Sequence, residues 1–467
     1  MSKSDTTLLM PVENQVRELD SKVLLACIAA RRGLSSLIGF RREMHFHISS
    51  FPPGIYLSKS MTAASDLVFR ILRNLGHEIV AWDEEALVHL PPEIYYPRRL
   101  SPVAMALVSH MFAWGQDNAE LWHQYSHLPN GAEIDITGNP RNDLLRPEIR
   151  SYYNKTVEEL RDKHGDFILI NTNFNHVNAF YPELNLFITN DKPGEEPRLG
   201  RAARGMTREY AEGLRAHKQA IFEKFQQLIP NLEKEFPEHN IVVRPHPTEN
   251  QEIYRHIAAQ RSRVWVTNEG NVVPWLMATR AVIHNGCTTG VEAYAMGVPA
   301  VSYRAVVNEH YDYGFYRLPN LLSHQCFDFD ELRFTLEKIL AGKLGTAAGN
   351  ERKTLADEYL AALDGPLACE RIVDVCCKMI YGQPKISRPA LHLWLKGYCT
   401  ANMRTLKRKF KARLPRARNK PEFHRHRYPD ISLEDMSERI SRFRQVLGDS
   451  SELKVEKILG QFFLINP

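Results

Sequence analysis

The sequence lacks any run of eighteen consecutive apolar residues, and its first twenty residues contain no apolar segment typical of a secretory signal. We therefore expect no membrane-spanning helix and a cytoplasmic location. Internal repeats and low-complexity segments are also absent. The 467 residues, of which 43% are hydrophobic and 25% charged, are typical of a globular protein that is too long for one compact core.

Cysteine is scarce, and the seven cysteines form neither a CxxC pair nor a Cys/His spacing typical of a zinc site. This excludes a disulfide framework and fits reduced thiols. The GxGxxG, GxxxxGK[ST] and GxSxG motifs of dehydrogenases, P-loop NTPases and hydrolases are missing too. Asp328-Phe329-Asp330 looks like a DxD metal motif, but it precedes an amphipathic helix, so capping by Asp328 explains it better. We expect no metal and no cofactor.

Positive charge is concentrated in one segment. The whole chain carries a net charge of +5, whereas residues 385–427 contain fourteen Lys or Arg and one acid, a local charge of +13, which leaves −8 for the rest. Large apolar side chains interleave with these cations, namely Trp394, Leu395, Tyr398, Met403, Leu406 and Phe410. This pattern is typical of a helix lying on an anionic membrane. A solvated linker is an alternative; nucleic-acid binding is not expected, because no RNA- or DNA-binding motif accompanies the charge.

Short apolar runs alternate with amphipathic stretches, which indicates parallel α/β structure. We expect two Rossmann-like domains facing each other across a cleft, with a basic helical C-terminal extension. The predicted parts are an acceptor-side domain over 1–150, a nucleotide-sugar domain over 151–380 and the extension over 381–467. Strands are predicted at 34–40, 77–82, 106–114, 132–138, 166–174, 240–245, 262–268, 280–285 and 299–304. Helices are predicted after a cap at Asp20, ending at Gly33, and at 62–75, 116–126, 151–164, 207–229 and 289–296.

Ligands of such folds bind at the carboxyl ends of the strands. The stretch 280–303 reads as a strand, a tight turn at Asn285 and Gly286, two hydroxyls and a helix that ends at Gly297. The free N–H groups of a helix start suit a phosphate, to which Thr288 and Thr289 would add donors. One turn further, Glu292 would accept from a ribose diol. An ordinary helix cap explains the same residues equally well.

A second turn, Arg244-Pro245-His246-Pro247, follows the apolar residues 241–243. The prolines stiffen the backbone on both sides of His246. A positioned histidine would donate to a phosphate oxygen or protonate a leaving group. A structural loop histidine is the alternative.

The first half offers three groups of polar residues. The turn at 137–143 contains Asn139, Arg141 and Asp143, where Arg141 would line the cleft or simply pair with Asp143. A rigid loop over 51–56 is followed by Lys59. Acids at 83–85 follow a predicted strand, where Glu84 and Glu85 would serve as base or nucleophile or merely begin a solvated helix.

Together these motifs resemble a known family. The segments IYLSKS, DEE, TGNPRNDLLR, FILINTNF, RPHPTEN and IHNGCTTGVEAYAMGVPAVSY resemble, in order from about residue 20 to 380, the bacterial surface carbohydrate (surface polysaccharide) biosynthesis proteins. That family is similar in turn to the GT-B β-Kdo transferases of capsule and lipopolysaccharide assembly.

The resemblance implies a peripheral GT-B enzyme that transfers a sugar, Kdo or a related ulosonic acid, from a CMP-sugar to a lipid-linked or oligosaccharide acceptor. In CMP-sugar enzymes of this shape, an HP motif matching His246 contacts the nucleotide phosphate, and a hydroxyl pair matching Thr288 and Thr289 does so as well. An acidic motif ending in Gly supplies the base in bacterial sialyltransferases. Here Ala86 replaces that glycine, which weakens the match for Glu84 and Glu85.

Other functions remain compatible with these motifs. CDP-alditol phosphotransferases also have a GxPRND turn and an HP motif, and UDP-GlcNAc 2-epimerases share the fold and a related turn. A non-catalytic assembly protein that keeps the fold is the remaining alternative.

Overall fold

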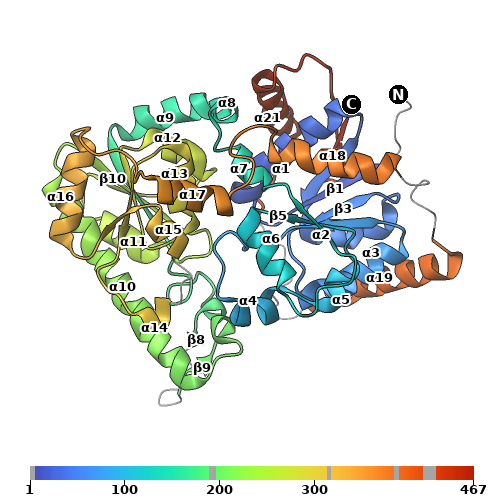
Figure 1. The fold of residues 1–467 in the computed structure, drawn as a ribbon, viewed down its shortest axis with the longest axis horizontal. Helices are drawn as coiled ribbons and strands as arrows, with labels where there is room; N and C mark the ends of the chain where they lie inside the picture. The colour runs from blue at the N-terminus through green and yellow to red at the C-terminus, as the bar shows by residue number, and fades with distance from the viewer. Residues whose placement is uncertain (1–5, 189–195, 313–316, 383–388, 414–426) are drawn as a thin grey trace. The chain divides into compact units, whose positions relative to one another are not determined.

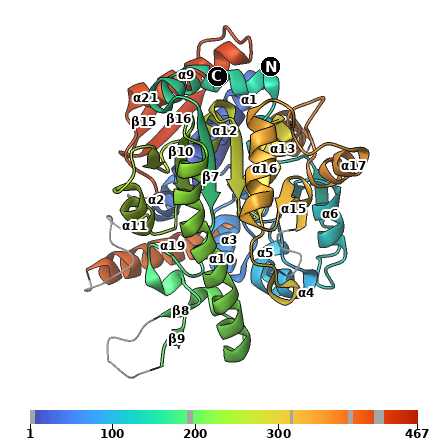
Figure 2. The same cartoon turned by 90° about the vertical axis from the view of Figure 1, so that its left-hand side faces the viewer.

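The computed structural model describes residues 6–188, 196–312, 317–382, 389–413 and 427–467. The chain forms two compact units, which are described separately: unit 1 comprises Met1–Tyr152 and Asp357–Pro467, and unit 2 comprises Tyr153–Ala356 (Figures 1 and 2). Residues 357–380, expected in the second domain, thus belong to unit 1. Residues 383–388 and 414–426 of the basic segment and its flank lie outside the described residues.

Unit 1 contains an eight-stranded sheet in the order β15-β16-β2-β1-β3-β4-β5-β6. The six strands from β2 to β6 are parallel. The order reverses between β1 and β3, a topological switch point of the kind at which doubly wound sheets bind ligands. The strands are β1 (Thr7–Val12), β2 (Ser35–Phe40), β3 (Ile55–Ser58), β4 (Glu78–Ala81), β5 (His110–Ala113), β6 (Glu133–Ile136), β15 (Lys454–Ile458) and β16 (Phe462–Asn466).

Two central strands of this sheet escaped the sequence analysis. Thr7–Val12 was not recognised as a strand, and Ile55 and Tyr56, expected in a rigid loop, begin β3. Both strands are almost fully buried, so they read as short continuous apolar runs without the alternation that reveals a half-buried strand.

The C-terminal end of the chain completes the unit-1 sheet. Strand β16 pairs antiparallel with β2, and β15 pairs with β16. Phe462 is fully buried, and a Cβ on Gly39 would lie only 2.3 Å from its ring, so glycine is required for this approach. The extension, expected to be helical, therefore also contains a β-hairpin. Its pairing partner lies more than 420 residues earlier, beyond the reach of local sequence patterns.

Helix α1 is the buried helix of unit 1. It spans Gln15–Arg31, is buried from Glu18 to Ala30 and packs against α18 and α21. It begins before Asp20, so the predicted cap at Asp20 was wrong: Asn14 occupies the N-cap position, and Asp20 instead pairs with Arg439 of α21 at 2.5 Å. The predicted end is confirmed, since Gly33 has a φ of 81°.

The remaining unit-1 helices surround the sheet, and Figure 1 shows α19 alongside α3. They are α2 (Arg41–His47), α3 (Asp66–Asn74), α4 (Pro92–Arg99), α5 (Pro102–Met105), α6 (Gln116–His123), α7 (Pro140–Asp143), α8 (Pro147–Arg150), α18 (Ala368–Tyr381), α19 (Leu391–Ala412) and α21 (Leu433–Val446). Helix α17 (Asn350–Tyr359) spans the boundary between the units. Within the described parts of the chain, no helix is both long and apolar enough to cross a bilayer.

Unit 2 contains a six-stranded parallel sheet in the order β11-β10-β7-β12-β13-β14. Relative to the first strand, β7, this is the 3-2-1-4-5-6 order of a dinucleotide-binding fold, with its switch point between β7 and β12. The strands are β7 (Phe167–Thr172), β10 (Asn240–Pro245), β11 (Val264–Val266), β12 (Ala281–His284), β13 (Ala300–Tyr303) and β14 (His324–Cys326), and a separate hairpin joins β8 (Phe187–Ile188) to β9 (Arg198–Leu199).

The longest helix of unit 2, α10, packs against β10 (Figure 2). It continues through Pro230 to Glu235, beyond its predicted end at 229, because buried Phe225, Leu228 and Leu232 hold it to the core on both sides of the proline. The unit-2 helices are α9 (Asn154–His164), α10 (Arg208–Glu235), α11 (Glu252–Ala258), α12 (Val272–Ala278), α13 (Thr288–Met296), α14 (Glu309–Asp312), α15 (Arg317–Leu321) and α16 (Phe329–Leu340). Asp328 caps α16 by accepting from the Glu331 N–H at 2.8 Å, as predicted.

We predict that Phe462→Ala lowers the free energy of unfolding by about 3–5 kcal/mol, because it removes a fully buried ring from the sheet. Urea denaturation measures this change. The control is Lys454→Ala in the same hairpin, where the side chain is 72% exposed and a change below about 0.5 kcal/mol is expected. Equal effects of the two variants would show that β16 contributes nothing to the fold.

Candidate active site

In unit 2, polar side chains join the ends of β7 and β12 at the switch point. The Asn285 carboxamide accepts from the Asn173 N–H at 3.1 Å and donates to the Asn173 carbonyl at 3.2 Å. Asn171 of β7 also donates through Nδ2 to Oγ1 of Thr289 in α13, at 3.0 Å. Asn285 and Thr289 therefore fix the turn between β12 and α13 against the central strand of the sheet.

The turn that begins α13 has the geometry predicted for it. Gly286 has a φ of 82°, and its N–H donates to His284 Nδ1 at 3.0 Å. Gly290 lets the helix pass close to the buried His284 ring, since a Cβ there would lie 2.4 Å from Nε2. Helix α13 ends at Gly297 in the left-handed region, as predicted.

The N-terminus of α13 is suited to an anion. The carbonyl of its N-cap residue, Cys287, accepts from the Gly290 N–H at 3.0 Å. Thr288 is half-buried and Thr289 is 7% exposed. Glu292 is buried one turn further along. The helix start thus combines N–H groups, hydroxyls and the positive end of the helix dipole.

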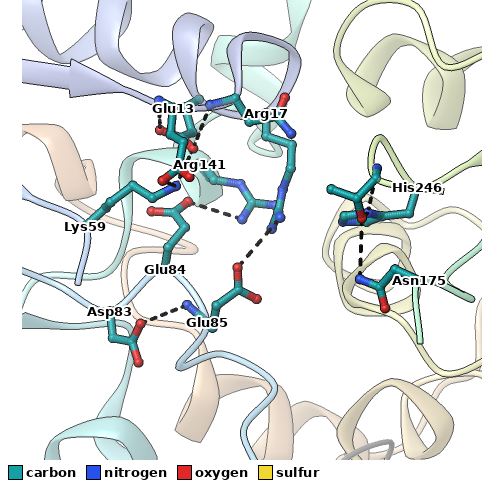
Figure 3. Close-up of polar contacts among 12 residues, drawn as sticks. Glu13, Arg17, Lys59, Asp83, Glu84, Glu85, Arg141, Asn175 and His246 are labelled. Atoms are coloured by element: carbon teal, nitrogen blue, oxygen red, sulfur yellow. Dashed lines mark hydrogen bonds and ion pairs between the residues drawn. The ribbon is translucent and has the colours of Figure 1, made fainter. Parts of the chain in front are cut away.

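His246 lies in a rigid loop after β10, as Figure 3 shows together with Asn175. Its Nδ1 accepts from the Thr248 N–H at 3.2 Å and lies 2.8 Å from the Thr248 hydroxyl. Its backbone N–H bonds to the Thr172 carbonyl at the end of β7. Because Nδ1 acts as acceptor, the proton of the neutral ring is on Nε2, which is therefore the donor nitrogen of this ring.

Glu249, which the sequence analysis did not single out, holds this loop. It is 1% exposed and accepts from the His246 N–H at 3.0 Å, from Thr172 Oγ1 at 2.9 Å and from the Tyr254 hydroxyl at 2.8 Å. Burial raises the pKa of this carboxyl, although these hydrogen bonds stabilise the carboxylate. Its position three residues after His246 is the feature of the sequence that could have identified it.

Arg244, expected to bind phosphate, contacts a neighbouring loop. Its guanidinium is buried, donates to the carbonyls of Glu269 (2.7 Å) and Gly270, and stacks on the Trp275 ring with its centre 5.3 Å away. Burial lowers its pKa to about 9, against the opposing charges of Glu269 and Glu292. In this arrangement Arg244 positions the loop at 269–270, and phosphate binding stays a prediction.

In unit 1, an ion-pair cluster occupies the switch point between β1 and β3 (Figure 3). Lys59, at the end of β3, lies 2.7 Å from Glu18 and 3.3 Å from Glu13, which follows β1. Arg41 and Arg427 also contact Glu13, at 2.8 and 3.2 Å. Lys59 is therefore committed to carboxylates within its own unit.

Glu84 belongs to the same cluster. It accepts from Trp82 Nε1 at 2.6 Å and pairs with Arg141 at 3.3 Å (Figure 3). Burial alone would raise the pKa of Glu84, but the charges of Arg141, Lys59 and Lys22 outweigh it and lower the pKa to about 2. Glu84 is thus a carboxylate that is ionised at neutral pH and pairs with Arg141.

The three consecutive acids have different environments. Asp83 is fully buried and binds Arg99 in a bidentate pair and the Tyr95 hydroxyl at 2.8 Å, so it is structural. The Glu85 side chain is 54% exposed and lies 3.8 Å from Arg17. Desolvation alone would raise the pKa of Glu85, but the charges of Arg17 and Arg99 outweigh it and lower the pKa. Glu85 is the exposed acid of this run, whereas Asp83 and Glu84 are buried.

The turn at 137–143 is largely structural. The Asn139 side chain accepts from the Arg141 N–H at 3.0 Å and caps α7. Asp143 accepts from the N–H groups of Ala368 and Cys369 at 2.8 Å each and so caps α18. Burial raises the pKa of Asp143 to about 6. Arg141 alone joins the cluster around Glu84.

Lys22 is a further buried cation that the sequence analysis missed. Its Nζ lies 3.8 Å from the centre of the Trp82 ring and has no hydrogen-bond partner among the described residues. Burial lowers its pKa to about 8, against the opposing charges of Glu84 and Glu18. In the sequence, Lys22 follows Asp20 and Ser21, and this pattern does not indicate a buried cation. The described residues contain no group of three or more His, Cys, Asp or Glu side chains arranged to hold a metal ion.

We predict that Glu84 makes stability pH-dependent. Because its pKa falls from 4.5 to about 2 on folding, its contribution is complete above pH 4.5 and is lost as the pH falls towards 2. Between pH 7 and pH 3 this loss amounts to about 2 kcal/mol of unfolding free energy. Urea denaturation at both pH values should show a smaller acid-induced loss in Glu84→Gln than in the wild type. An identical loss in both proteins would contradict the assignment.

Comparison with known proteins identifies the fold. No protein-family model matches the sequence, and neither does any curated protein. Among solved structures, the wall teichoic acid polymerase TagF aligns with a TM-score of 0.52 and 12% identity, over 81% of this chain and 90% of that chain. UDP-GlcNAc 2-epimerases align less well. The enzyme from Methanocaldococcus jannaschii has a TM-score of 0.46 and 12% identity over 80% and 99% of the two chains. That from Neisseria meningitidis has a TM-score of 0.45 and 12% identity over 81% and 100% of the two chains.

The TagF similarity and the two sheets confirm the predicted fold class, an α/β protein with two Rossmann-like sheets of the GT-B type.

Proposed function

We propose that this protein is a glycosyltransferase of bacterial surface polysaccharide biosynthesis that uses a nucleotide-activated sugar. The observation that carries the proposal is the switch point of unit 2. There the N-terminus of α13, with Thr288 and Thr289, follows β12, and His246 follows β10, both beside the central strand β7. Carboxyl ends of parallel strands in this order are the usual place for a nucleotide phosphate.

The chemistry of glycosyl transfer requires such groups. When the bond between the sugar and the phosphate breaks, negative charge develops on the nucleotide phosphate. The N–H groups of α13, the hydroxyls of Thr288 and Thr289 and Nε2–H of His246 would stabilise this charge from fixed positions. We therefore propose that transfer proceeds without a metal cofactor.

Glu85 is the proposed base for the acceptor hydroxyl, since Glu84 is already held by Arg141 and Trp82. A carboxylate of low pKa is a weak base in the ground state. It can still accept the proton as the acceptor oxygen bonds to the anomeric carbon, because the hydroxyl becomes much more acidic at that stage. Arg17 keeps the Glu85 carboxylate ionised.

The proposed donor is a CMP-sugar, with Kdo or a related ulosonic acid as the sugar, and the product is a capsule or lipopolysaccharide glycan. This choice rests on the order of the motifs around His246 and Thr288. The acceptor is a lipid-linked glycan or oligosaccharide, which would bring the enzyme to the inner face of the cytoplasmic membrane.

A CDP-alditol phosphotransferase is the second candidate. The fold similarity to TagF and the GNPRND turn favour it. In this chain, however, Asp143 of that turn caps α18, so a structural role accounts for the aspartate. Product mass separates the two functions, because a phosphotransferase leaves a phosphate in the product.

We predict that CMP raises the melting temperature and that His246→Ala reduces this rise. A ligand present at about 100 times its Kd adds about 2.7 kcal/mol of stability. Thermal-shift curves with CMP, CDP, UMP, UDP and GDP measure the preference. His256→Ala, an exposed histidine of α11, is the matched control and should keep the full rise. A response confined to CDP would favour the phosphotransferase, and a lack of response to any nucleotide would contradict both functions.

We also predict that Glu85→Gln lowers the turnover of sugar transfer at least ~100-fold while leaving the thermal shift with nucleotide unchanged. His246→Ala should lower turnover by a similar factor, because it removes a donor to the leaving phosphate. Transfer is measured by product mass with a CMP-Kdo donor. Asp117→Asn is the matched control for removal of an acid elsewhere in unit 1. Turnover of Glu85→Gln near that of the wild type would remove Glu85 from the mechanism.

A further inference from the structure

Helix α19 is attached to unit 1 by a face of small side chains. Gly397 and Ala401 are buried against α3, and a Cβ on Gly397 would lie 2.8 Å from Cβ of Asn74. Thr405, one turn further along, donates to the Phe46 carbonyl at 3.5 Å. These contacts determine which face of α19 points away from the protein.

One side of α19 carries exposed apolar side chains. It carries Leu391, Leu395, Tyr398, Leu406 and Phe410, whose exposures are 72%, 46%, 41%, 67% and 67%. Their spacings of four, three, eight and four residues place them along one side of a helix. A helix that merely covers a globular protein presents charge on this side, so the exposed apolar stripe indicates an interaction surface.

Positive charge lies within this stripe, at Lys409 and Arg413, and beside it. Residues 391–413 contain seven Lys or Arg and no acid. Lys396, Lys407, Lys409, Lys411 and Arg413 are exposed. The surface thus combines large apolar side chains with cations in the manner of a helix that lies in a membrane interface.

A cluster of arginines lies where α19 meets α2. Arg42 and Arg408 both contact the Phe46 ring, with their guanidinium carbons 5.2 and 5.9 Å from its centre. Burial and then the charges of Arg408 and Arg41 lower the pKa of Arg404 to about 10, whereas Tyr56 opposes this shift. An anion bound at this cluster would relieve the repulsion among these cations.

We propose that the outward face of α19 lies in the headgroup region of an anionic phospholipid membrane, with a lipid phosphate at Arg42, Arg404 and Arg408. This proposal rests on the proposed function, because that function supplies the lipid-linked acceptor. The surface itself is inferred from α19 and α2 alone. A second copy of this chain fits poorly, because each copy would bring seven cations to the contact. A nucleic acid would leave the apolar stripe exposed to water.

Co-sedimentation of the full chain with vesicles tests the proposal. Vesicles containing about 40% phosphatidylglycerol in phosphatidylcholine should bind the protein, and phosphatidylcholine vesicles should not. Combined Leu406→Asn and Phe410→Asn should weaken binding at least about tenfold. Combined Arg404→Gln and Arg408→Gln should weaken it and reduce its dependence on salt.

Matched controls use exposed residues of unit 2. Phe334→Asn removes a ring that is 56% exposed, and combined Lys224→Gln and Lys234→Gln removes two exposed cations of α10. Both controls should bind vesicles within about twofold of the wild type. The thermal shift with CMP, measured on each variant, reports the proposed function separately, so a failure of membrane binding and a failure of nucleotide binding are distinguished.

Three outcomes would overturn the proposal. The wild type could remain unbound at low salt, or the Leu406/Phe410 variant could bind like the wild type. Alternatively, sedimentation velocity could show a dimer that the Leu406/Phe410 variant loses, which would assign this face to a second copy.

Discussion

The reciprocal hydrogen bonds between the Asn285 side chain and the Asn173 backbone hold together the two strand ends at which the unit-2 sheet reverses its order. Asn171 extends this connection to Thr289, so the start of α13 is attached to the central strand β7. Glu249 and Thr172 attach the His246 loop to the same strand. The proposed phosphate site is therefore built on backbone and short side chains that lose little freedom when a ligand binds.

The unit-1 switch point is organised by buried charge. Glu18, Lys22, Lys59 and Glu84 are removed from water around α1 and β3, so each must be compensated by its neighbours. The loss of one member would leave another charge uncompensated, so the fold of this region requires every member of the cluster. For the same reason, protonation of a carboxylate at acid pH would destabilise the cluster. The exposed Glu85 lies at the edge of this cluster, where the surrounding cations keep it ionised.

The C-terminal part of the chain is integral to unit 1. Helix α18 receives its cap from Asp143, α21 pairs with Asp20 of α1, and β16 extends the sheet beside β2. Attachment to this rigid framework gives α19 a defined orientation. Its outward face can therefore present apolar and cationic side chains in a constant arrangement to a membrane.

The sequence by itself determined those features whose physical cause is local. Short apolar runs predicted nine of the fourteen strands in the two sheets, Gly286 and Gly297 predicted backbone turns with positive φ, and Asp328 predicted a cap three residues away. Only the tertiary structure decided the rest, because the partners are distant in sequence. Asp143 became a cap through N–H groups 225 and 226 residues later, and burial with Arg99 made Asp83 structural while leaving Glu85 accessible. Thr7–Val12 became a central strand because it pairs with β2 and β3, which come from other parts of the sequence. Local patterns record propensity, but burial and the charges brought together by folding determine the role of each side chain.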